Sequence, residues 1–436
     1  MIPAVTATDT QRAIDAVWRI ESPRLIAGLA RIVRDVGLAE ELAQDALVIA
    51  LERWPASGIP DNPGAWLMAT AKHRAIDRLR HRRLAERKHA EIGRDMDAAD
   101  DPVAALEDAL DDDIGDDLLR LVFTACHPVL ATEARVALTL RLLCGLTTDE
   151  IARAFLAPEP TVAQRIVRAK RALRDAGVPF EVPRGPDRAE RLASVLEVVY
   201  LVFNEGYTAT AGDDWTRPAL CQEALRLGRV LAGLAPEEAE VHGLVALLEI
   251  QASRLAARAG PEGEPVLLLD QDRARWDRLL IRRGLAALER AEALGQPGPY
   301  ALQAAIAACH ARAPSGAETN WPRIAALYAA LATIAPSPIV ELNRAVALSM
   351  AFGPAVGLEI VDALADEPAL KAYHLLPSVR GDFLMKLGRR DEARAEFERA
   401  AAMTQNARER ALLVDRAAAC GDGAGQYPDS QLPPSS

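Results

Sequence analysis

Apolar residues recur at intervals of three and four along almost the whole of this 436-residue chain, whereas alternation with a period of two is nearly absent. The first spacing places apolar side chains on one face of an α-helix, and the second would be needed for half-buried strands. The sequence therefore predicts an all-α fold. At this length, with half of its residues apolar, the chain can form two or three separate cores.

The charges of the chain are distributed unevenly. Its net charge of -11 would repel nucleic acid unless the basic residues are gathered in one place. Residues 72–88 hold eight lysines or arginines against two acids, whereas residues 95–117 hold eleven acids and no base. This reversal, with Pro102 inside it, indicates a solvated linker between two compact pieces. We place a first helical domain at residues 12–88 and an acidic linker at residues 89–116.

The stretch AWLMATAKHRAIDRLRHRR, residues 65–83, begins as an apolar helix and becomes a row of arginines. Four of its apolar side chains are expected to face inward: Trp66, Ala69, Ile76 and Leu79. Arg74, Arg78 and Arg82 then share one stripe of the helix, where like charges repel. Such a row can be a solvated surface, or it can bind a polyanion, of which the nucleic acid backbone is the commonest.

A second helical domain is expected at residues 117–176. Thr147 and Glu150 have the spacing of a capping box, so a helix should begin there, and Pro158 and Pro160 should interrupt it. A basic helix follows, with one apolar stripe formed by Val162, Ile166, Ala169 and Leu173. This order is typical of a helix-turn-helix, although an ordinary helical hairpin with a solvated basic face has the same pattern. Two basic helices in an acidic chain favour DNA contact at two places.

Both domains resemble the extracytoplasmic-function (ECF) sigma factors of the sigma-70 class. GLAEELAQDALVIALERW followed by NPGAWLMATAKHRAIDRLRHRR is similar to region 2 of that family, and GLTTDEIARAFLAPEPTVAQRIVRAKRALR is similar to region 4. The resemblance covers roughly residues 12–175. It implies that core RNA polymerase and promoter DNA are the partners, and that the chain is not an enzyme because polymerase performs the chemistry.

The resemblance also implies three sets of site residues. The helix implied to dock on the coiled coil of the largest polymerase subunit carries Glu41, Asp45, Leu47 and Trp54. The loop at residues 55–63 and the helix after it would open and read the minus-ten element, with Trp66, Lys72, Arg74, Arg78 and Arg82. Residues implied to contact the minus-thirty-five element, the first four nearest the bases, are Thr161, Gln164, Arg165, Arg168, Lys170, Arg171 and Arg174. Taken on its residues alone, the acid-bearing first helix is compatible with a partner helix and equally with internal packing.

The turn before the second basic helix departs from the family pattern. Leu156 stands where the turn usually has glycine, and Pro160 stands where glycine often precedes the threonine. The base contacts therefore follow less directly from the sequence than the fold does.

A third, larger helical region is expected at residues 188–420. MKLGRRDEARAEFERAAAM, residues 385–403, matches the spacing of a tetratricopeptide (TPR) repeat, and weaker echoes upstream suggest a short α-solenoid. The segment at residues 195–215, which contains FNEGYTA, ends an apolar helix in a polar loop that could be either a ligand site or a helix cap and turn. A subgroup of ECF sigma factors carries an extension similar to this one, which implies a modulating role or a protein partner. Residues 421–436 lack the apolar surface needed to order a tail.

The sequence gives little indication of metal binding, cofactor binding or catalysis. Cys126-His127 and Cys309-His310 are adjacent pairs whose side chains diverge on a helix, so we expect neither to bind zinc. We find no Gly-rich phosphate-binding motif and no catalytic constellation, and we expect no cofactor. Scattered cysteines, no secretory leader and no long apolar run predict a cytoplasmic protein. The alternatives to a sigma factor are a TPR-type scaffold and a DNA-binding regulator that acts without core polymerase.

Overall fold

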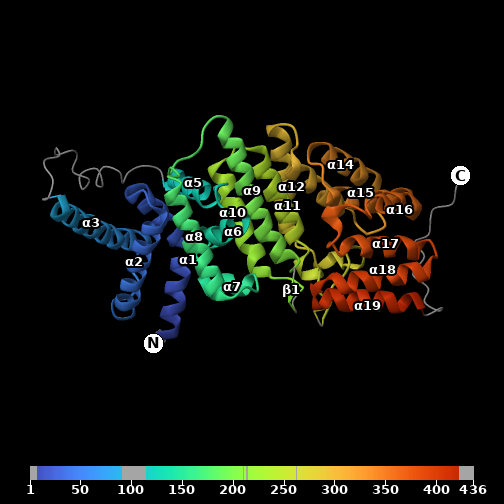
Figure 1. Ribbon diagram of the computed structural model, residues 1–436, viewed down its shortest axis with the longest axis horizontal. Helices are drawn as coiled ribbons and strands as arrows, with labels where there is room; N and C mark the ends of the chain where they lie inside the picture. Colours follow the sequence, from blue (N-terminus) through green and yellow to red (C-terminus); the bar gives the residue numbers. More distant parts are fainter. Residues whose placement is uncertain (1–6, 91–113, 210, 213–214, 262, 422–436) are drawn as a thin grey trace. The chain divides into compact units, whose positions relative to one another are not determined.

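The computed structural model describes residues 7–90, 114–209, 211–212, 215–261 and 263–421 (Figure 1). These residues form helices, apart from two short strands, β1 (Ala211–Gly212) and β2 (Gln405–Asn406), which pair in parallel. The all-α fold is confirmed. The expected linker and C-terminal tail lie almost entirely outside the described residues. The chain divides into two compact units between Val199 and Tyr200.

The first unit contains two groups of helices and the first part of one further helix. In chain order they are α1 (Ala7–Val33), α2 (Val36–Ser57), α3 (Pro63–Ala90), α5 (Ile114–Ala125), α6 (Thr132–Leu143), α7 (Thr148–Ala154), α8 (Glu159–Asp175) and α9 (Pro186–Tyr207). Helices α1, α2 and α3 pack against one another, α8 packs on α6 and α7, and α1 also contacts α5 and α6. Asp35 caps α2 by accepting a hydrogen bond from the Leu38 amide at 3.0 Å. The helix ends at Gly58, whose φ of +79° favours glycine.

The buried side of α3 differs from the side expected from the sequence. Leu67, Ala71 and Ala75 are fully buried, whereas Ala69 is exposed and Trp66 and Ile76 are only half-buried. The side chain of Leu79 lies outside the described residues. The expectation of an inward stripe at Ala69 was wrong: its row also holds the exposed Ala65 and His73, and α3 instead buries the wholly apolar i, i+4, i+8 row of Leu67, Ala71 and Ala75. That row lets α3 approach α1 and α2 closely.

The helix-turn-helix forms as expected. Thr147 and Glu150 make both hydrogen bonds of the capping box, at 3.1 and 2.8 Å, so α7 begins directly after Thr147. Leu156 has a φ of +48°, the left-handed conformation for which glycine is usual at this turn. Pro158 precedes α8, and the predicted apolar stripe of α8 is buried.

Helix α9 belongs to both units. Near its N-terminal end, Arg191 donates to the Phe123 carbonyl at 3.0 Å and Ser194 donates to the Cys126 carbonyl at 2.6 Å. Arg135 of α6 pairs with Glu197 at 2.9 Å. The first part of α9 therefore completes the core of the helix-turn-helix domain, although the sequence placed the start of the C-terminal region at residue 188.

The second unit is a succession of antiparallel helices. These are α10 (Pro218–Leu234), α11 (Ala239–Ala252), α12 (Arg278–Leu294), α13 (Pro299–Arg312), α14 (Trp321–Ile334), α15 (Pro338–Phe352), α16 (Pro354–Ala363), α17 (Leu375–Lys386), α18 (Arg390–Met403) and α19 (Ala407–Gly421). Short 3-10 turns lie at η1 (Leu255–Ala257), η2 (Leu268–Asp270), η3 (Arg273–Arg275) and η4 (Pro368–Leu370). From α13 onward, each α-helix packs on the next one along the chain, which is the arrangement of a helical solenoid.

The segment with TPR-like spacing is a helical hairpin. Helix α17 ends before Gly388, which turns with a φ of +77°, and α18 follows. Ala393, Phe397 and Ala400 of α18 are buried. A Cβ atom at Gly381 of α17 would lie 2.9 Å from the Phe397 ring, so the two helices approach closely there. The hairpin is observed, and its assignment to the TPR family stays a prediction.

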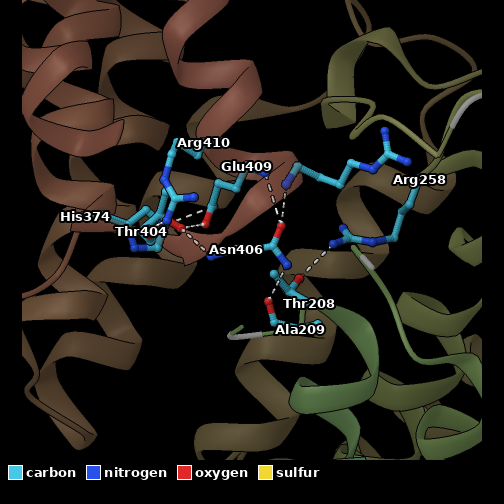
Figure 2. A network of polar contacts seen from close by, with 9 residues as sticks. Thr208, Ala209, Arg258, His374, Thr404, Asn406, Glu409 and Arg410 are labelled. Carbon is cyan, nitrogen blue, oxygen red and sulfur yellow. Dashed lines mark hydrogen bonds and ion pairs between the residues drawn. The ribbon is translucent and has the colours of Figure 1, made fainter. Parts of the chain in front are cut away.

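The end of the FNEGYTA segment is held by two distant parts of the second unit (Figure 2). Arg258 donates to the Tyr207 carbonyl at 3.0 Å and to the Thr208 hydroxyl at 2.8 Å. Asn406, which is fully buried, donates to the Ala209 carbonyl at 3.2 Å. Its side-chain oxygen also accepts hydrogen bonds from the amides of Arg408 and Glu409, and so caps α19. These contacts are those of a helix end and turn, one of the two interpretations that the sequence left open.

Candidate nucleic-acid interface

Helix α8 turns one polar face toward solvent. Its buried stripe fixes the rotation of the helix, and on the opposite side Thr161, Gln164, Arg168 and Arg171 are exposed. Arg165 is half-buried at the edge of this face. Arg171 pairs with Asp175 one turn later at 3.2 Å, a surface ion pair of little energy. The exposed face can therefore meet a DNA groove without rearrangement of its own helix.

Two of the seven α8 residues expected to contact DNA are paired with acids of α2 or of its N-cap. Lys170 is largely buried and forms an ion pair with Glu40 of α2. Arg174 lies 3.7 Å from Asp35, the residue that caps α2. In this structure both cations are engaged with acids of the first helical group.

The arginine row of α3 is exposed where the structure describes it. Arg74 lies on the surface, and Arg78 pairs with Glu41 of α2 at 3.0 Å, both side chains being more than half exposed. An exposed pair of this kind is worth about 0–1 kcal/mol, so a phosphate can replace the carboxylate. Lys72 is half-buried, and this burial, together with nearby Arg31, lowers its pKa. The side chain of Arg82 lies outside the described residues.

The two tryptophans of this region have different surroundings. Trp54 is 1% exposed, and the edge of its ring system meets that of Trp66, with centroids 5.2 Å apart. Trp66 is half-buried and retains part of its surface at the start of α3. Trp54 therefore lies inside the domain, where it supports Trp66 and is not a surface residue of α2.

The outer face of α2 carries acids and one apolar residue. Glu41 and Asp45 are exposed, Leu47 is half-buried, and Val48 is 52% exposed. Glu52 continues the same face one turn later. Val48 and Glu52 were not among the residues expected at this surface, although their positions, i+7 and i+11 from Glu41, place them on the same side of the helix.

The described residues give no indication of a metal site, a disulfide or a membrane-spanning helix. No group of three or more histidine, cysteine or acidic side chains is placed to bind a metal in the part of the chain described here. All five cysteines are buried, and none forms a disulfide. Within the same ranges, none of the helices combines the length and apolar character that a membrane span requires.

The two helical groups of the first unit match known families in the order expected. Residues 18–84 match the family described as Sigma-70 region 2, and residues 120–173 match Sigma-70, region 4. Residues 191–292, which begin in α9, match a family of unknown function, DUF6596. A basic helix, a helix-turn-helix and these matches define a transcription initiation factor that binds DNA.

Similar proteins agree with this class. The chain is 33% identical over 157 residues to the ECF RNA polymerase sigma factor SigK of Mycobacterium tuberculosis, covering 35% of this chain and 79% of SigK. It is 44% identical over 402 residues to the uncharacterized protein R00370 of Rhizobium meliloti, covering 92% of this chain and 94% of that protein. No solved structure matches the chain. The chain belongs to the ECF sigma factors of the sigma-70 family, which are non-enzymatic initiation factors, and it carries a long helical C-terminal extension.

Proposed function

We propose that this sigma factor binds core polymerase through α2, the minus-ten element through α3 and the minus-thirty-five element through α8, and that its C-terminal extension modulates this activity. The observation that carries the proposal is the exposed face of α8, on which Thr161, Gln164 and Arg168 lie opposite a fully buried apolar stripe. In a helix-turn-helix, the start of the second helix reaches the base edges and the later basic residues meet phosphates.

The proposed minus-ten site combines an aromatic residue with exposed cations. Opening a duplex requires a surface for the displaced bases and positive charge for the backbone. Trp66 has part of its ring system at the surface, supported from beneath by Trp54, and Arg74 and Arg78 lie farther along the same helix. The connection before α3 is shorter than expected, residues 58–62, because α2 continues to Ser57.

The proposed polymerase surface is the outer face of α2. Glu41, Asp45 and Glu52 give it negative charge, and Val48 gives it an exposed apolar centre. This composition suits a partner helix that offers basic and apolar side chains. Trp54 is omitted from the contact surface, because it is buried in the domain.

The base contacts of α8 can be tested on promoter DNA that the wild-type holoenzyme selects from a random library. Arg168→Ala and Gln164→Ala should each cost about 1–3 kcal/mol of binding, and only for sequences that carry the selected upstream element. Arg171→Ala is the matched control on the same helix face. It should weaken all DNA similarly and lower the salt slope by about one unit. If Arg168→Ala lost the same fraction of affinity for every sequence, the base-contact assignment would be wrong.

One experiment distinguishes the three possible functions of the chain: a sigma factor, a DNA-binding regulator that acts without core polymerase, and a scaffold. A sigma factor should co-purify with core polymerase and support run-off transcription from the selected promoter. A regulator acting alone would bind the DNA without polymerase and give no transcript, and a scaffold would do neither.

The role proposed for the extension can be tested by truncation. A chain ending at Thr208 keeps all of α9, whereas a chain ending near Arg184 would lose the bonds from Arg191 and Ser194 to the helix-turn-helix domain. We expect the variant that ends at Thr208 to bind core polymerase and to give an altered level of run-off transcript. A coupling of about 1–3 kcal/mol between the extension and the promoter-binding domains would change activity by about 5- to 150-fold. An unchanged transcript level would contradict the modulating role.

A further inference from the structure

A cavity of about 330 Å³ lies in the second unit, between the end of α13 and the start of α14. Its wall includes Cys309 and Arg312 of α13, Glu318 of the connection that follows, and Asn320 and Arg323 at the start of α14. The charged side chains of this wall are exposed, so the cavity is open to solvent. Sites that bind small molecules usually have volumes of about 300–1,000 Å³.

Two arginines of the wall have no acidic partner. In the part of the chain that the structure describes, no carboxylate forms an ion pair with Arg312 or Arg323, whereas Arg290 of α12 and Arg344 of α15 each pair with a glutamate. Both arginines of the wall lie near the same thiol: burial raises the pKa of Cys309, and the charges of Arg323 and Arg312 oppose that rise. Two guanidinium groups therefore meet at one cavity with their charges unpaired.

Further arginines beside the cavity add positive charge. Arg273 donates to the carbonyl oxygens of His310 at 2.5 Å and Ala313 at 2.7 Å, so it covers the negative end of α13 that would otherwise repel an anion. Burial, together with the nearby Arg254 and Arg278, lowers the pKa of Arg273. Among the described residues, the hydrogen-bond partners of Arg254 and Arg273 are neutral groups.

The remaining polar groups of the wall are one acid and one amide. Glu318 accepts a hydrogen bond from the Ser315 hydroxyl at 2.7 Å, and its charge opposes those of Arg312 and Arg323. Asn320 caps α14 through its side-chain oxygen, which accepts from the Arg323 amide at 3.0 Å, and its NH₂ group is a further donor. With two arginines and one glutamate, the wall carries a net positive charge.

We propose that this cavity binds a small phosphate ester, with Arg312 and Arg323 contacting the phosphate group and Asn320 supplying a neutral donor. A guanidinium group can bind two phosphate oxygens through parallel hydrogen bonds. A phosphate monoester carries a charge of about -1.5 to -2 at neutral pH, which two arginines balance, whereas a monocarboxylate would leave one arginine unpaired. The inference concerns the second unit alone and does not depend on the functions proposed for α2, α3 and α8.

Calorimetric titration of the full-length protein with glycerol 2-phosphate tests the site. We expect a dissociation constant below about 1 mM. Arg312→Ala and Arg323→Ala should each weaken binding at least about tenfold, because each removes a charged donor to the phosphate. Both side chains are exposed and take part in no ion pair among the described residues, so the variants should fold.

Three further variants make the test specific. Arg282→Ala is the matched control, since Arg282 is an exposed arginine of α12 outside the cavity wall, and its loss should leave binding unchanged. Glu318→Gln removes the opposing charge and should strengthen binding severalfold. Arg323→Lys keeps the charge but loses the planar fork, so its affinity should lie between those of the wild type and Arg323→Ala.

Cys309 reports occupancy from within the wall. Its alkylation by iodoacetamide, quantified by mass spectrometry, should slow severalfold when glycerol 2-phosphate is saturating. Cys221 of the same unit is 0% exposed and lies outside the cavity wall, so its alkylation should not respond to the phosphate ester.

Each contrary result overturns a defined part of the proposal. A dissociation constant above about 1 mM would show that the cavity is not a phosphate site. Equal losses in Arg282→Ala and Arg312→Ala would indicate general attraction to a basic surface, and unchanged alkylation of Cys309 would place the anion elsewhere. Tighter binding of malonate would make the ligand a dicarboxylate. If duplex DNA without promoter elements bound in an Arg312-dependent manner and the ester did not, the phosphate would come from nucleic acid and the small-molecule site would be wrong.

Discussion

Replacing Trp54 by alanine should lower the free energy of unfolding of the first unit by about 3–5 kcal/mol, the usual cost of deleting a buried tryptophan side chain. Trp54 is 1% exposed and meets Trp66 edge to face at 5.2 Å, so the truncation would leave a cavity beneath the proposed minus-ten surface. Hydrogen exchange of amides in α2 and α3, followed through urea denaturation, measures this loss separately from the second unit.

Trp54→Phe is the matched control. The indole nitrogen of Trp54 is buried without a hydrogen-bond partner, so phenylalanine keeps an aromatic ring and loses no bond. We expect it to cost much less than alanine. A Trp54→Ala variant of unchanged stability that no longer bound polymerase would instead support the direct contact implied by the family resemblance.

Features that depend on short spacings could be predicted from the sequence. The capping box at Thr147 and Glu150 needs only four consecutive residues, and the apolar stripe of α8 needs only helical periodicity. Pro158 lies in the interruption between α7 and α8, as expected, whereas Pro160 lies in the first turn of α8, where a missing backbone donor costs no hydrogen bond of the helix. The helix-turn-helix and its exposed face were therefore expected correctly.

The ion pairs between distant helices could not be predicted in the same way. Lys170 and Arg174 look like the other basic residues of α8 in the sequence. Their pairing with Glu40 and Asp35 depends on how α8 packs on α2. The side of Ala69 was likewise not predictable, because alanine suits a buried and an exposed row equally, and the choice depends on how α3 packs against α1 and α2.

The boundary of the C-terminal region illustrates a similar limit. Prolines and glycines at residues 177–188 predict a break in the chain, and a break is present between α8 and α9. Composition does not reveal that Arg191 and Ser194 then reach back to carbonyl groups of the helix-turn-helix domain. A turn in the chain is thus a weaker criterion for a domain boundary than the hydrogen bonds that cross it.

The second unit should lose stability in acid because of one histidine. His310, at the end of α13, is 8% exposed and lies edge-on to Trp321 with ring centroids 5.2 Å apart. Burial, which has the largest effect, and the nearby Arg254 and Arg273 together lower its pKa to about 4. In the unfolded chain, the pKa of histidine is about 6.5.

The sign of the effect follows from these two pKa values. Above pH 6.5, His310 is neutral in both states, and its contribution is constant. As the pH falls below 6.5, His310 becomes protonated in the unfolded chain but stays neutral in the folded unit. The free energy of unfolding therefore decreases until the pH reaches about 4. At pH 4.5 the loss should be about 2–3 kcal/mol relative to pH 7.

His310→Phe isolates this contribution. Phenylalanine keeps the aromatic contact with Trp321 and cannot be protonated, and His310 Nδ1 is buried without a hydrogen-bond partner that the change would remove. Titration of the carboxylates affects both proteins equally. His127, whose pKa is also lowered to about 4, lies in the first unit, so hydrogen exchange in α13 separates the effect of His310 from that of His127. Between pH 7 and 4.5 the wild-type unit should lose about 2–3 kcal/mol more than the variant, and parallel curves would mean that His310 is protonated as readily in the folded unit as in the unfolded chain.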